Sequence, residues 1–328
     1  MRRALPVELP RFRLGQLPTP LHDAPRLARA IGVARILVKR DDLTGFAGGG
    51  NKVRKMEFLL GDALAGGADT IIAVGGPQSN AVRTALVAAR AAGLDPIAVM
   101  YGDPPAERDG NLVLDDLAGA RLVFTGQADR ASMEPAAEAL AADLRAAGKR
   151  PYVIPRGGAT AVGDAGYVDA SAELAEQLDS LGAAPAHLVV ATGSCGTQAG
   201  LIAGAAWLGA PYDVRGILVS RPREEAVPRL LELAQATADL LRLGITIGPE
   251  DVRVEEGFLG PGFGIASPEG AAAQRLALAS EGLVLDPTYT AKAMAGVIGL
   301  INDGTIRPDA SLVFVHTGGE PAVYARSH

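Results

Sequence analysis

Short runs of β-branched and aliphatic residues alternate with longer Ala- and Leu-rich stretches along most of this chain of 328 residues. The short runs predict strands and the longer stretches predict helices. Strands that alternate with helices in this way predict an α/β protein whose parallel sheets have helices on both faces. The predicted strands are 36–39, 70–74, 96–100, 121–124, 152–154, 187–191, 214–220 and 312–315, and the predicted helices are 54–65, 80–92, 135–147, 167–181, 197–207, 224–243, 268–280 and 290–302.

Composition indicates a globular protein with an aliphatic core, because 48% of the residues are hydrophobic and only 4% are aromatic. The formal net charge is -6 and no stretch gathers a basic stripe, which argues against nucleic acid and anionic membranes as main partners. Gly, Asp or Arg interrupts every apolar run before the roughly 20 residues that a membrane-spanning helix needs. Residues 1–14 contain no continuous apolar segment, so we expect a cytoplasmic protein.

Few other residues suggest a site of their own. The single cysteine, Cys195, excludes an intramolecular disulfide, and the four histidines have no metal-ligand spacing, so no metal site is expected. Asp41 and Asp42 could form an acid pair, but turn and capping roles are favoured. His316 is expected to be structural at a strand end, and Trp207 is expected to be a core residue.

The glycine-rich run 48–55 reads Gly-Gly-Gly-Asn-Lys-Val-Arg-Lys and follows a predicted strand and a polar turn. It places Lys52 where a strand leads into a helix within a pocket of small residues. A lysine in that setting can hold an aldehyde cofactor as a Schiff base. Lysine occurs only at positions 39, 52, 55, 149 and 292, and Lys52 alone lies among small residues.

Two further loops follow predicted strands and begin helices, which is where ligands bind in open α/β sheets. In the loop 75–80, Ser79 is a candidate helix cap whose neighbouring amides point at an anion, and a simple capped turn is the alternative. The loop 192–197 reads Thr-Gly-Ser-Cys-Gly-Thr, so its backbone N–H groups can converge on a phosphate, assisted by the Ser194 and Thr197 hydroxyls. It lacks the lysine of a P-loop and the acidic ribose ligand of a dinucleotide site. A phosphorylated aldehyde is therefore the expected ligand.

These loops belong to a set of ordered motifs that resembles the D-cysteine desulfhydrase and 1-aminocyclopropane-1-carboxylate (ACC) deaminase family. Members are pyridoxal 5'-phosphate (PLP) enzymes of the tryptophan synthase β fold type. The resemblance covers nearly the whole chain, from Leu14 to Ala325. The motifs are Val-Lys-Arg-Asp-Asp-Leu-Thr-Gly (38–45), Gly-Asn-Lys-Val-Arg-Lys (50–55), Gln-Ser-Asn (78–80), Thr-Gly-Ser (192–194), Asp-Pro-Thr-Tyr (286–289) and His-Thr-Gly-Gly (316–319).

The resemblance implies a role for each matching residue. Lys52 would carry PLP and, when an amino acid displaces it, would take the Cα proton. Asn80 would bind the 3'-hydroxyl of the cofactor ring, Ser79 would lie beside the substrate carboxylate, and Tyr289 would approach the reacting side of the substrate. The catalytic residues would be Lys52, Ser79 and Tyr289; the cofactor-binding residues Lys52, Asn51, Asn80, Gly193, Ser194, Cys195, Gly196, Thr197, Thr290 and Thr317; and the substrate-binding residues Ser79, Asn80, Ala81, Phe263 and Tyr289.

The implied fold has two doubly wound domains, with helices on both sheet faces and PLP in the cleft between them (PLP fold type II). Residues 1–52 and 161–328 would form the larger, PLP-binding domain, and residues 53–160 the smaller, inserted one. Family members are commonly homodimers, so a homodimer is expected here. The alternative roles for Ser79 and Tyr289 are a capping serine and a tyrosine packed at the start of a helix.

Several residues depart from the family pattern. Thr290 stands where ACC deaminases have glutamate, and a hydroxyl near the ring nitrogen, from Thr290 or Thr317, would leave the pyridine neutral. Phe263 replaces a tyrosine, and Ala81 and Thr84 replace larger polar residues, so a different or larger substrate is a hypothesis. In the phosphate loop, Cys195 and Gln198 replace glycine and histidine. Cys195 could have a lowered pKa at a helix N-terminus, but a small residue tolerated in the loop is the favoured interpretation.

The resulting prediction is a PLP-dependent carbon-sulfur lyase or deaminase of amino-acid metabolism. It would catalyse α,β-elimination on a small amino acid, as D-cysteine desulfhydrase does in giving pyruvate, ammonia and sulfide. The enzymatic alternatives are an ACC deaminase-like or cysteate sulfo-lyase-like reaction with an altered substrate. A PLP-binding protein without the family's turnover is the alternative from a different class.

Overall fold

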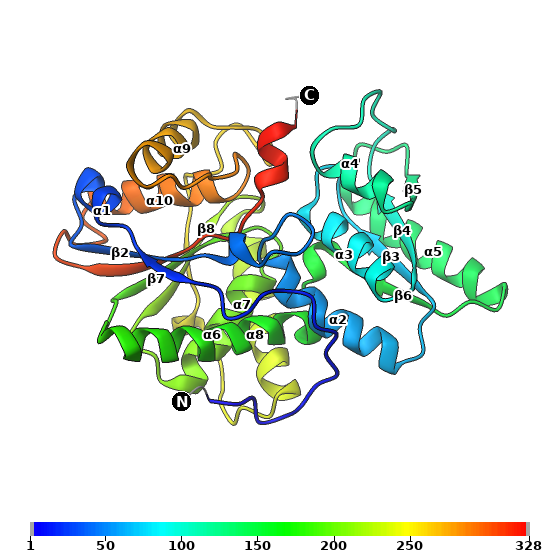
Figure 1. The fold of residues 1–328 in the computed structure, drawn as a ribbon, viewed down its shortest axis with the longest axis horizontal. Helices are drawn as coiled ribbons and strands as arrows, with labels where there is room; N and C mark the ends of the chain where they lie inside the picture. The colour runs from blue at the N-terminus through cyan, green and yellow to red at the C-terminus, as the bar shows by residue number, and fades with distance from the viewer. Residues whose placement is uncertain (1–2, 326–328) are drawn as a thin grey trace.

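The structure, a computed structural model, describes residues 3–325. Its strands form two separate sheets with helices packed against them (Figure 1). The strands are β1 (Leu21–Asp23), β2 (Arg35–Lys39), β3 (Thr70–Val74), β4 (Asp95–Met100), β5 (Arg121–Phe124), β6 (Pro151–Ile154), β7 (His187–Thr192), β8 (Asp213–Leu218), β9 (Arg253–Glu255) and β10 (Ser311–Val315). The helices are α1 (Pro25–Ile31), α2 (Lys52–Ala65), α3 (Asn80–Ala91), α4 (Gly110–Leu117), α5 (Met133–Ala146), α6 (Ala161–Leu181), α7 (Gly196–Leu208), α8 (Arg223–Leu240), α9 (Pro268–Glu281) and α10 (Thr290–Asn302).

The larger sheet has the strand order β1-β2-β10-β7-β8-β9, in which only β1 is antiparallel to its neighbour. Side chains of a strand point alternately to its two faces, so each strand feeds two cores. Val38 and Val189 pack with α1, α9 and α10, whereas Leu37 and Val190 pack with α6, α7 and α8. Figure 1 shows these two helical layers on opposite sides of the sheet.

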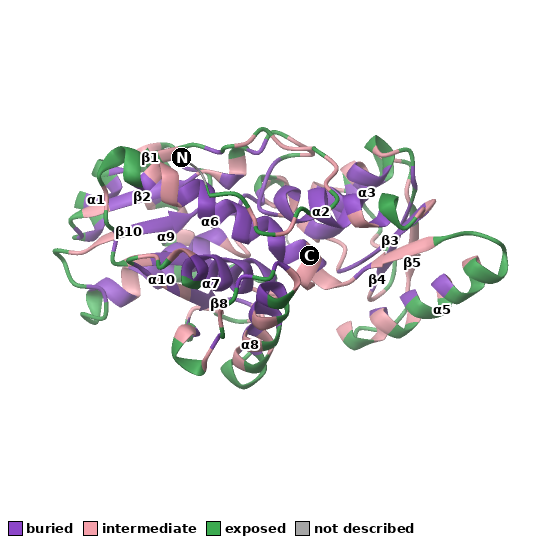
Figure 2. Cartoon of the chain, turned by 90° about the horizontal axis from the view of Figure 1, so that it is seen from below, coloured by how far each residue is buried: buried purple, intermediate pink, exposed green. Residues whose placement is uncertain are grey.

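The smaller sheet has the order β5-β4-β3-β6, and every pair in it is parallel. Ile71 and Ala73 pack with α2 and α3 on one face, and Ile72 and Val74 pack with α5 on the other. Figure 2 shows that α5 lies at the outside with few of its residues buried, whereas α6 and α7 are largely buried. Both sheets therefore have helices on both faces, which confirms the doubly wound fold. The domain boundaries at residues 52 and 160 stay a prediction.

Element bounds differ from the sequence prediction at a few places. Helix α6 begins at Ala161, six residues before the predicted start, because the Thr160 hydroxyl accepts a hydrogen bond from Gly163 N and caps it there. The helices α1 and α4 were not predicted, since seven and eight residues are too few to show a helical period clearly.

The turn aspartate Asp41 has a role that the sequence analysis did not give it. Its carboxylate is fully buried and accepts hydrogen bonds from Arg54 Nη2 (2.9 Å) and Tyr167 Oη (2.6 Å). Arg54 also pairs with Glu173, which in turn binds Lys39, so two cations and two anions form one buried cluster between β2, α2 and α6. Burial opposes the ionised form of Asp41, but Arg54, together with Lys39 and Tyr167, outweighs burial and holds the pKa of Asp41 below its ordinary value.

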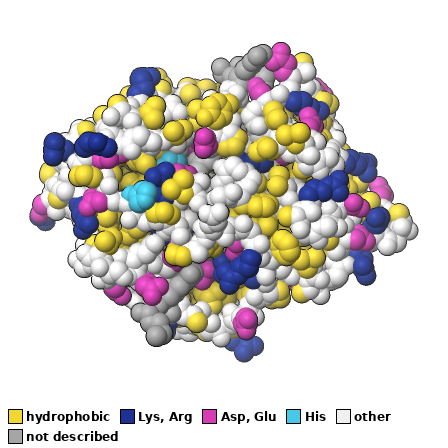
Figure 3. All heavy atoms as spheres, in the orientation of Figure 1, with side chains coloured by type: hydrophobic (Ala, Val, Ile, Leu, Met, Phe, Trp, Pro, Cys, Tyr) yellow, Lys and Arg dark blue, Asp and Glu magenta, His cyan; other side chains and the backbone are white. Residues whose placement is uncertain are grey.

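Within residues 3–325, no helix combines the length and apolar character needed to cross a membrane. The same part of the chain brings together no three His, Cys, Asp or Glu side chains that could hold a metal ion. On the face shown in Figure 3, Lys and Arg side chains are interspersed with Asp and Glu and form no continuous basic stripe.

Candidate active site

A cavity of about 630 Å³ lies where the loops of the two sheets meet. Most of its walls come from residues at the carboxyl ends of β3, β4, β5 and β6 in the smaller sheet and of β7, β8 and β10 in the larger one. The start of α2, residues 263–266 and the loop before α10 complete them. The sequence-predicted residues that line it are Asn51, Lys52, Ser79, Asn80, Ala81, Gly193, Ser194, Cys195, Thr197, Phe263, Tyr289 and Thr317. Gly196 and Thr290 are not among the residues of its walls.

Lys52 is the first residue of α2 and reaches the cavity from the junction of the two sheets. The glycine run before it lets the backbone pass close to β10, since a side chain at Gly50 (φ 108°) would meet Thr317 O. A Cβ at Gly157 would lie 3.6 Å from the Lys52 amine and would collide with Ser194, so glycine keeps this part of the cavity open. Burial, with Lys55 adding repulsion, lowers the pKa of Lys52 to about 7. The amine is thus substantially neutral near pH 7, as a nucleophile must be.

A buried ion pair lies directly behind the loop that begins α7. Lys55 Nζ and an Asp164 carboxylate oxygen are 2.9 Å apart, and both side chains are fully buried. A Cβ at Gly196 would meet both groups, which explains a glycine at this position. Gly196 itself does not line the cavity. It lies against this ion pair, and both charges of the pair act on the pKa of Lys52.

Two carbonyl groups of the loop 192–197 accept hydrogen bonds from arginine side chains. Arg221 donates to Gly193 O (3.1 Å) and Arg229 donates to Ser194 O (3.3 Å). The N–H groups of Cys195, Gly196 and Thr197 find no backbone acceptor within residues 3–325, because they belong to the first turn of α7. Small residues and free N–H donors at a helix N-terminus are the elements of an anion site.

Cys195 takes part in this loop through its backbone. Its φ of 76° turns the chain into α7, and its side chain is buried. Burial raises the pKa of Cys195 to about 11, so the thiol is not a thiolate at neutral pH. The favoured interpretation, a small residue held in the loop, agrees with this placement. The side chain of Gln198 is also held in place by hydrogen bonds. Its oxygen accepts from the Thr192 hydroxyl (2.7 Å), and its amide nitrogen donates to Arg253 O (2.8 Å).

Asn80 has its side-chain oxygen fixed by two neighbours. Asn111 donates to Asn80 Oδ1 over 2.9 Å and Arg83 donates to it over 3.2 Å. Arg83 also donates to Gly49 O (2.9 Å), which ties the glycine run before Lys52 to α3. With its oxygen engaged, the side chain of Asn80 has its amide N–H groups left for a ligand in the cavity. Ser79 lines the same wall and caps α3, since Val82 N donates to its hydroxyl (3.3 Å).

Asp286 organises the loop that presents Tyr289. Its carboxylate accepts hydrogen bonds from the backbone N–H groups of Thr288 (3.0 Å) and Tyr289 (3.0 Å). The Tyr289 ring lies against Gly193, where a Cβ would approach its Cε1 to 3.1 Å. The buried hydroxyl of Thr290 donates to Asp286 Oδ1 (2.7 Å), and its contact with the cofactor stays a prediction. Thr317 does line the cavity, and the structure records no hydrogen bond from its hydroxyl among the described residues.

The wall beside Tyr289 carries Phe263, whose ring meets the tyrosine edge-on with centroids 6.0 Å apart and an interplanar angle of 71°. The guanidinium of Arg130 lies 4.2 Å from the centre of the Phe263 ring. Tyr101 lies against Gly76, where a Cβ would come within 2.7 Å of the Tyr101 ring. Aromatic and cationic side chains thus border this part of the cavity.

Comparison with known proteins places the chain in a family. A family model described as pyridoxal-phosphate dependent enzyme matches residues 12–318. This chain is a pyridoxal-phosphate-dependent enzyme. It is 41% identical over 323 residues to a D-cysteine desulfhydrase of Salmonella paratyphi C (strain RKS4594) and 40% identical to that of Salmonella newport (strain SL254), with 96% of each chain covered.

Solved structures agree with this family. The crystal structure of an ACC deaminase homologue superposes with a TM-score of 0.89 at 37% identity, and covers 97% of this chain and 94% of its own. A threonine deaminase from T.th. has a TM-score of 0.65 at 23% identity, with 94% and 93% covered, which shows the shared fold alone.

The cavity of this pyridoxal-phosphate-dependent enzyme fits its cofactor on physical grounds. Lys52 supplies an amine with a lowered pKa for the aldehyde, and the free N–H groups of the 193–197 loop suit a phosphate. The amide of Asn80 and the hydroxyl of Thr317 supply polar contacts for the ring. When bound, PLP provides an electron sink for the pair left on Cα when a proton departs.

Several residues that line the cavity of this enzyme were missed by sequence reasoning. Their position in the sequence could have identified them, because each follows the carboxyl end of a correctly predicted strand. The loops 75–80 and 192–197, which the sequence analysis did identify, follow strands in the same way. The missed residues are Tyr101 after β4, Arg130 after β5, Arg156 and Gly157 after β6, and Ser220 and Arg221 after β8.

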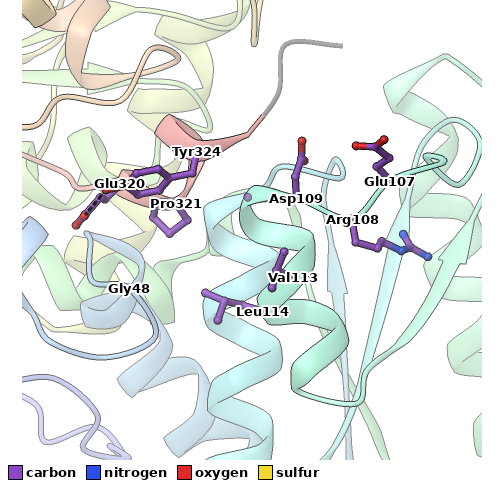
Figure 4. A pocket seen from close by; sticks show the side chains of 10 residues that line it. Gly48, Glu107, Arg108, Asp109, Val113, Leu114, Glu320, Pro321 and Tyr324 are labelled. Atoms are coloured by element: carbon purple, nitrogen blue, oxygen red, sulfur yellow. Dashed lines mark hydrogen bonds between the residues drawn. The ribbon is translucent and has the colours of Figure 1, made fainter.

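A second, more open hollow lies between α4 and the C-terminal 3-10 helix Glu320–Tyr324 (Figure 4). Its walls include Arg108, Val113 and Tyr324, and Tyr324 donates to Glu320 across 3.4 Å. Of the motif residues only Gly48, in the glycine run, reaches it. The chemistry of the family therefore belongs to the first cavity.

Proposed function

We propose that this enzyme catalyses α,β-elimination on a small amino acid that carries a leaving group on Cβ, with D-cysteine as the preferred substrate. The observation that supports it most directly is the Lys52 amine, whose pKa is lowered to about 7 and which lines the cavity beside the 193–197 loop. The D-cysteine desulfhydrases that resemble this chain over 96% of its length support the choice of substrate.

In this proposal Lys52 takes the proton from Cα, and the Cβ–S bond breaks with both of its electrons leaving on sulfur. The released three-carbon enamine takes up one water and gives pyruvate and ammonium. D-cysteine and water are thus converted to pyruvate, ammonia and hydrogen sulfide without any external oxidant or reductant. Tyr289 or Ser79, both in the cavity wall, would pass a proton to the departing sulfur.

The α-carboxylate of the substrate would bind at the N-terminus of α3. The N–H groups of Asn80 and Ala81 have no backbone acceptor within residues 3–325, and the positive end of the helix dipole adds to their attraction for an anion. Ala81 leaves more space there than a larger polar residue would, and the Ser79 hydroxyl lies beside it.

The test is to incubate the PLP-loaded enzyme with D-cysteine, L-cysteine, β-chloroalanine and ACC while measuring pyruvate, 2-oxobutyrate, ammonia and sulfide. We expect pyruvate and sulfide from D-cysteine. Formation of 2-oxobutyrate from ACC would instead establish the deaminase alternative, which the ACC deaminase homologue at 37% identity favours. Binding of these amino acids without any keto acid would identify a PLP-binding protein without turnover. Lys52→Ala should abolish both activity and the absorbance of lysine-bound PLP.

Assembly and location complete the proposal. A homodimer and a cytoplasmic location are predictions from the family resemblance and from the sequence. Light scattering of the purified protein tests the first, because a monomeric mass would exclude the dimer. Cell fractionation tests the second.

A further inference from the structure

The candidate cavity is lined by basic side chains and, among the described residues, by no acidic one. Arg130, Arg156 and Arg221 are in its walls together with the amine of Lys52. This contrasts with the whole chain, whose formal net charge is -6. A cavity of this charge is suited to ligands with several negative groups.

Three of the four basic side chains already have a function or a partner. Lys52 is the proposed base, Arg221 donates to Gly193 O in the anion-binding loop, and Arg156 forms an ion pair with Glu134. Arg130 differs from these three. Its only side-chain hydrogen bonds among residues 3–325 go to the Ser220 hydroxyl at 3.4 and 3.5 Å, and no carboxylate among these residues pairs with it.

The position of Arg130 keeps its donors available. It lies in the 3-10 helix Arg130–Ser132, in the connection from β5 to α5 of the smaller sheet, and it reaches across to Ser220, which follows β8 of the larger sheet. Its guanidinium is placed over the ring of Phe263, 4.2 Å from the ring centre. A guanidinium over an aromatic ring spends no hydrogen bond on a carboxylate there, so its N–H groups keep the fork that matches an oxyanion.

Phe263 in turn contacts Tyr289, so Arg130 belongs to the wall that the reacting side of the substrate would face. The α-carboxylate has another place to bind, at the N-terminus of α3. The phosphate of PLP also has its own place, at the 193–197 loop. The donors of Arg130 are thus available to a third anionic group.

We propose that Arg130 binds an anionic group on the side chain of the amino-acid substrate, so that the cavity accepts, besides D-cysteine, amino acids with an ionised sulfonate, carboxylate or phosphate on or next to Cβ. This inference rests on the proposed function in that the ligand is an amino acid. For a sulfonate on Cβ, the Cβ–S bond would break with its electrons leaving on sulfite. Water would then convert the enamine to pyruvate and ammonium, as with cysteine.

The test uses aspartate and asparagine, which have nearly the same shape and differ in one charge. Dissociation constants are measured by calorimetry on the PLP-loaded enzyme, with both enantiomers. We expect the native enzyme to bind aspartate at least about tenfold more tightly than asparagine, because a charge-assisted hydrogen bond is roughly twice as strong as a neutral one. Arg130→Gln should weaken aspartate binding by about 10- to 100-fold and asparagine binding by less than about threefold.

Two further variants separate a local contact from a general effect of charge. Arg130→Lys keeps the charge but loses the fork, so it should recover part of the preference for aspartate. Arg145→Gln removes a charge from the exposed end of α5 and should leave both dissociation constants unchanged. Unfolding temperature and PLP absorbance confirm that each variant is folded and loaded.

The inference fails if aspartate and asparagine bind equally tightly or if neither binds. It also fails if Arg130→Gln weakens the binding of both to the same extent, because that result would assign Arg130 to the α-carboxylate. Turnover of cysteine, cysteate and O-phosphoserine separates this result from the proposed function. Sulfide from D-cysteine with no preference for aspartate would remove only the inference. An Arg130-dependent preference for aspartate without sulfide from D-cysteine would remove only the choice of D-cysteine as substrate.

Discussion

Asn111 donates from its side-chain amide to Asn80 Oδ1 over 2.9 Å. Arg83 binds the same oxygen over 3.2 Å and also binds Asn111 Oδ1 over 2.8 Å, so the three side chains form a closed, buried group. Since neither Asn111 nor Arg83 lines the cavity, both act on a bound ligand through the orientation of Asn80.

Asn111→Ala should therefore weaken PLP binding without touching the cofactor. Loss of one neutral hydrogen bond predicts a dissociation constant about five- to tenfold larger, measured by absorbance titration of the apo-protein. In a double-mutant cycle with Asn80→Ala, the two effects should be clearly less than additive, because both act through one amide. The exposed Asn302, at the end of α10, supplies the control Asn302→Ala. Full additivity with Asn80→Ala would show that Asn111 acts on stability alone.

The pKa of Lys52 predicts how the apo-protein takes up PLP at different pH values. Only the neutral amine attacks an aldehyde, so uptake should accelerate as pH rises through about 7 and then level off. An ordinary lysine, with a pKa near 10.4, would show acceleration continuing past pH 9. Stopped-flow absorbance between pH 5.5 and 9.5 measures the profile. A midpoint above about pH 9 would contradict the proposed environment of this amine.

Arg54 should be far more important to stability than a surface arginine. Arg54→Met leaves the carboxylates of Asp41 and Glu173 buried without their main partner, which costs about 3–5 kcal/mol. Urea denaturation at pH 7 measures the loss. The control is Arg307→Met, since Arg307 pairs with Asp309 in an exposed position and should leave the unfolding midpoint unchanged. Equal midpoints for both variants would rule out a net contribution from the cluster.

The pH dependence of the Arg54 effect follows from its partners. Because Arg54 outweighs burial, the pKa of Asp41 and that of Glu173 lie below their ordinary values. The stability that this pairing contributes is present above the unfolded pKa values, near pH 4, and is lost as pH falls through the folded ones. The difference between Arg54→Met and the native chain should accordingly shrink in acid.

Asp115 should behave in the opposite way. Burial raises the pKa of Asp115 to about 7, although Arg83 opposes the shift. Between pH 4 and 7 the unfolded chain releases this proton while the folded chain keeps it, so stability falls as pH rises through that window. Asp115→Asn should therefore stabilise the protein by about 2–4 kcal/mol at pH 8 and by almost nothing at pH 4. Asp116→Asn, at the exposed neighbouring position, should show no such pH-dependent gain.

The alternation of strands and helices was enough to predict the α/β class with parallel sheets, because buried parallel strands and their covering helices leave local, repeated signals. The same holds for Lys52, Ser79 and the 192–197 loop, which follow strands directly and consist of small residues. The division into two doubly wound domains came from the family resemblance. The short helices α1 and α4 lack such a signal, since their length is set by contacts with the rest of the protein.

Other features of the site depend on residues far apart in the sequence. The ion pair of Lys55 with Asp164 and the stacking of Arg130 on Phe263 arise only when the two sheets come together, and no linear spacing reports them. Thr290 shows a different difficulty. It follows Tyr289 directly, but successive residues at the start of a helix point about 100° apart, so its hydroxyl meets Asp286 instead of the cavity.

The buried cluster of Lys39, Asp41, Arg54 and Glu173 also limits how this sequence can diverge. Because each charge is neutralised by partners from distant segments, a substitution at one position leaves an unpaired ion and is tolerated only after a compensating change elsewhere. These four positions should vary together among relatives or not at all, even though no member of the cluster lines the cavity.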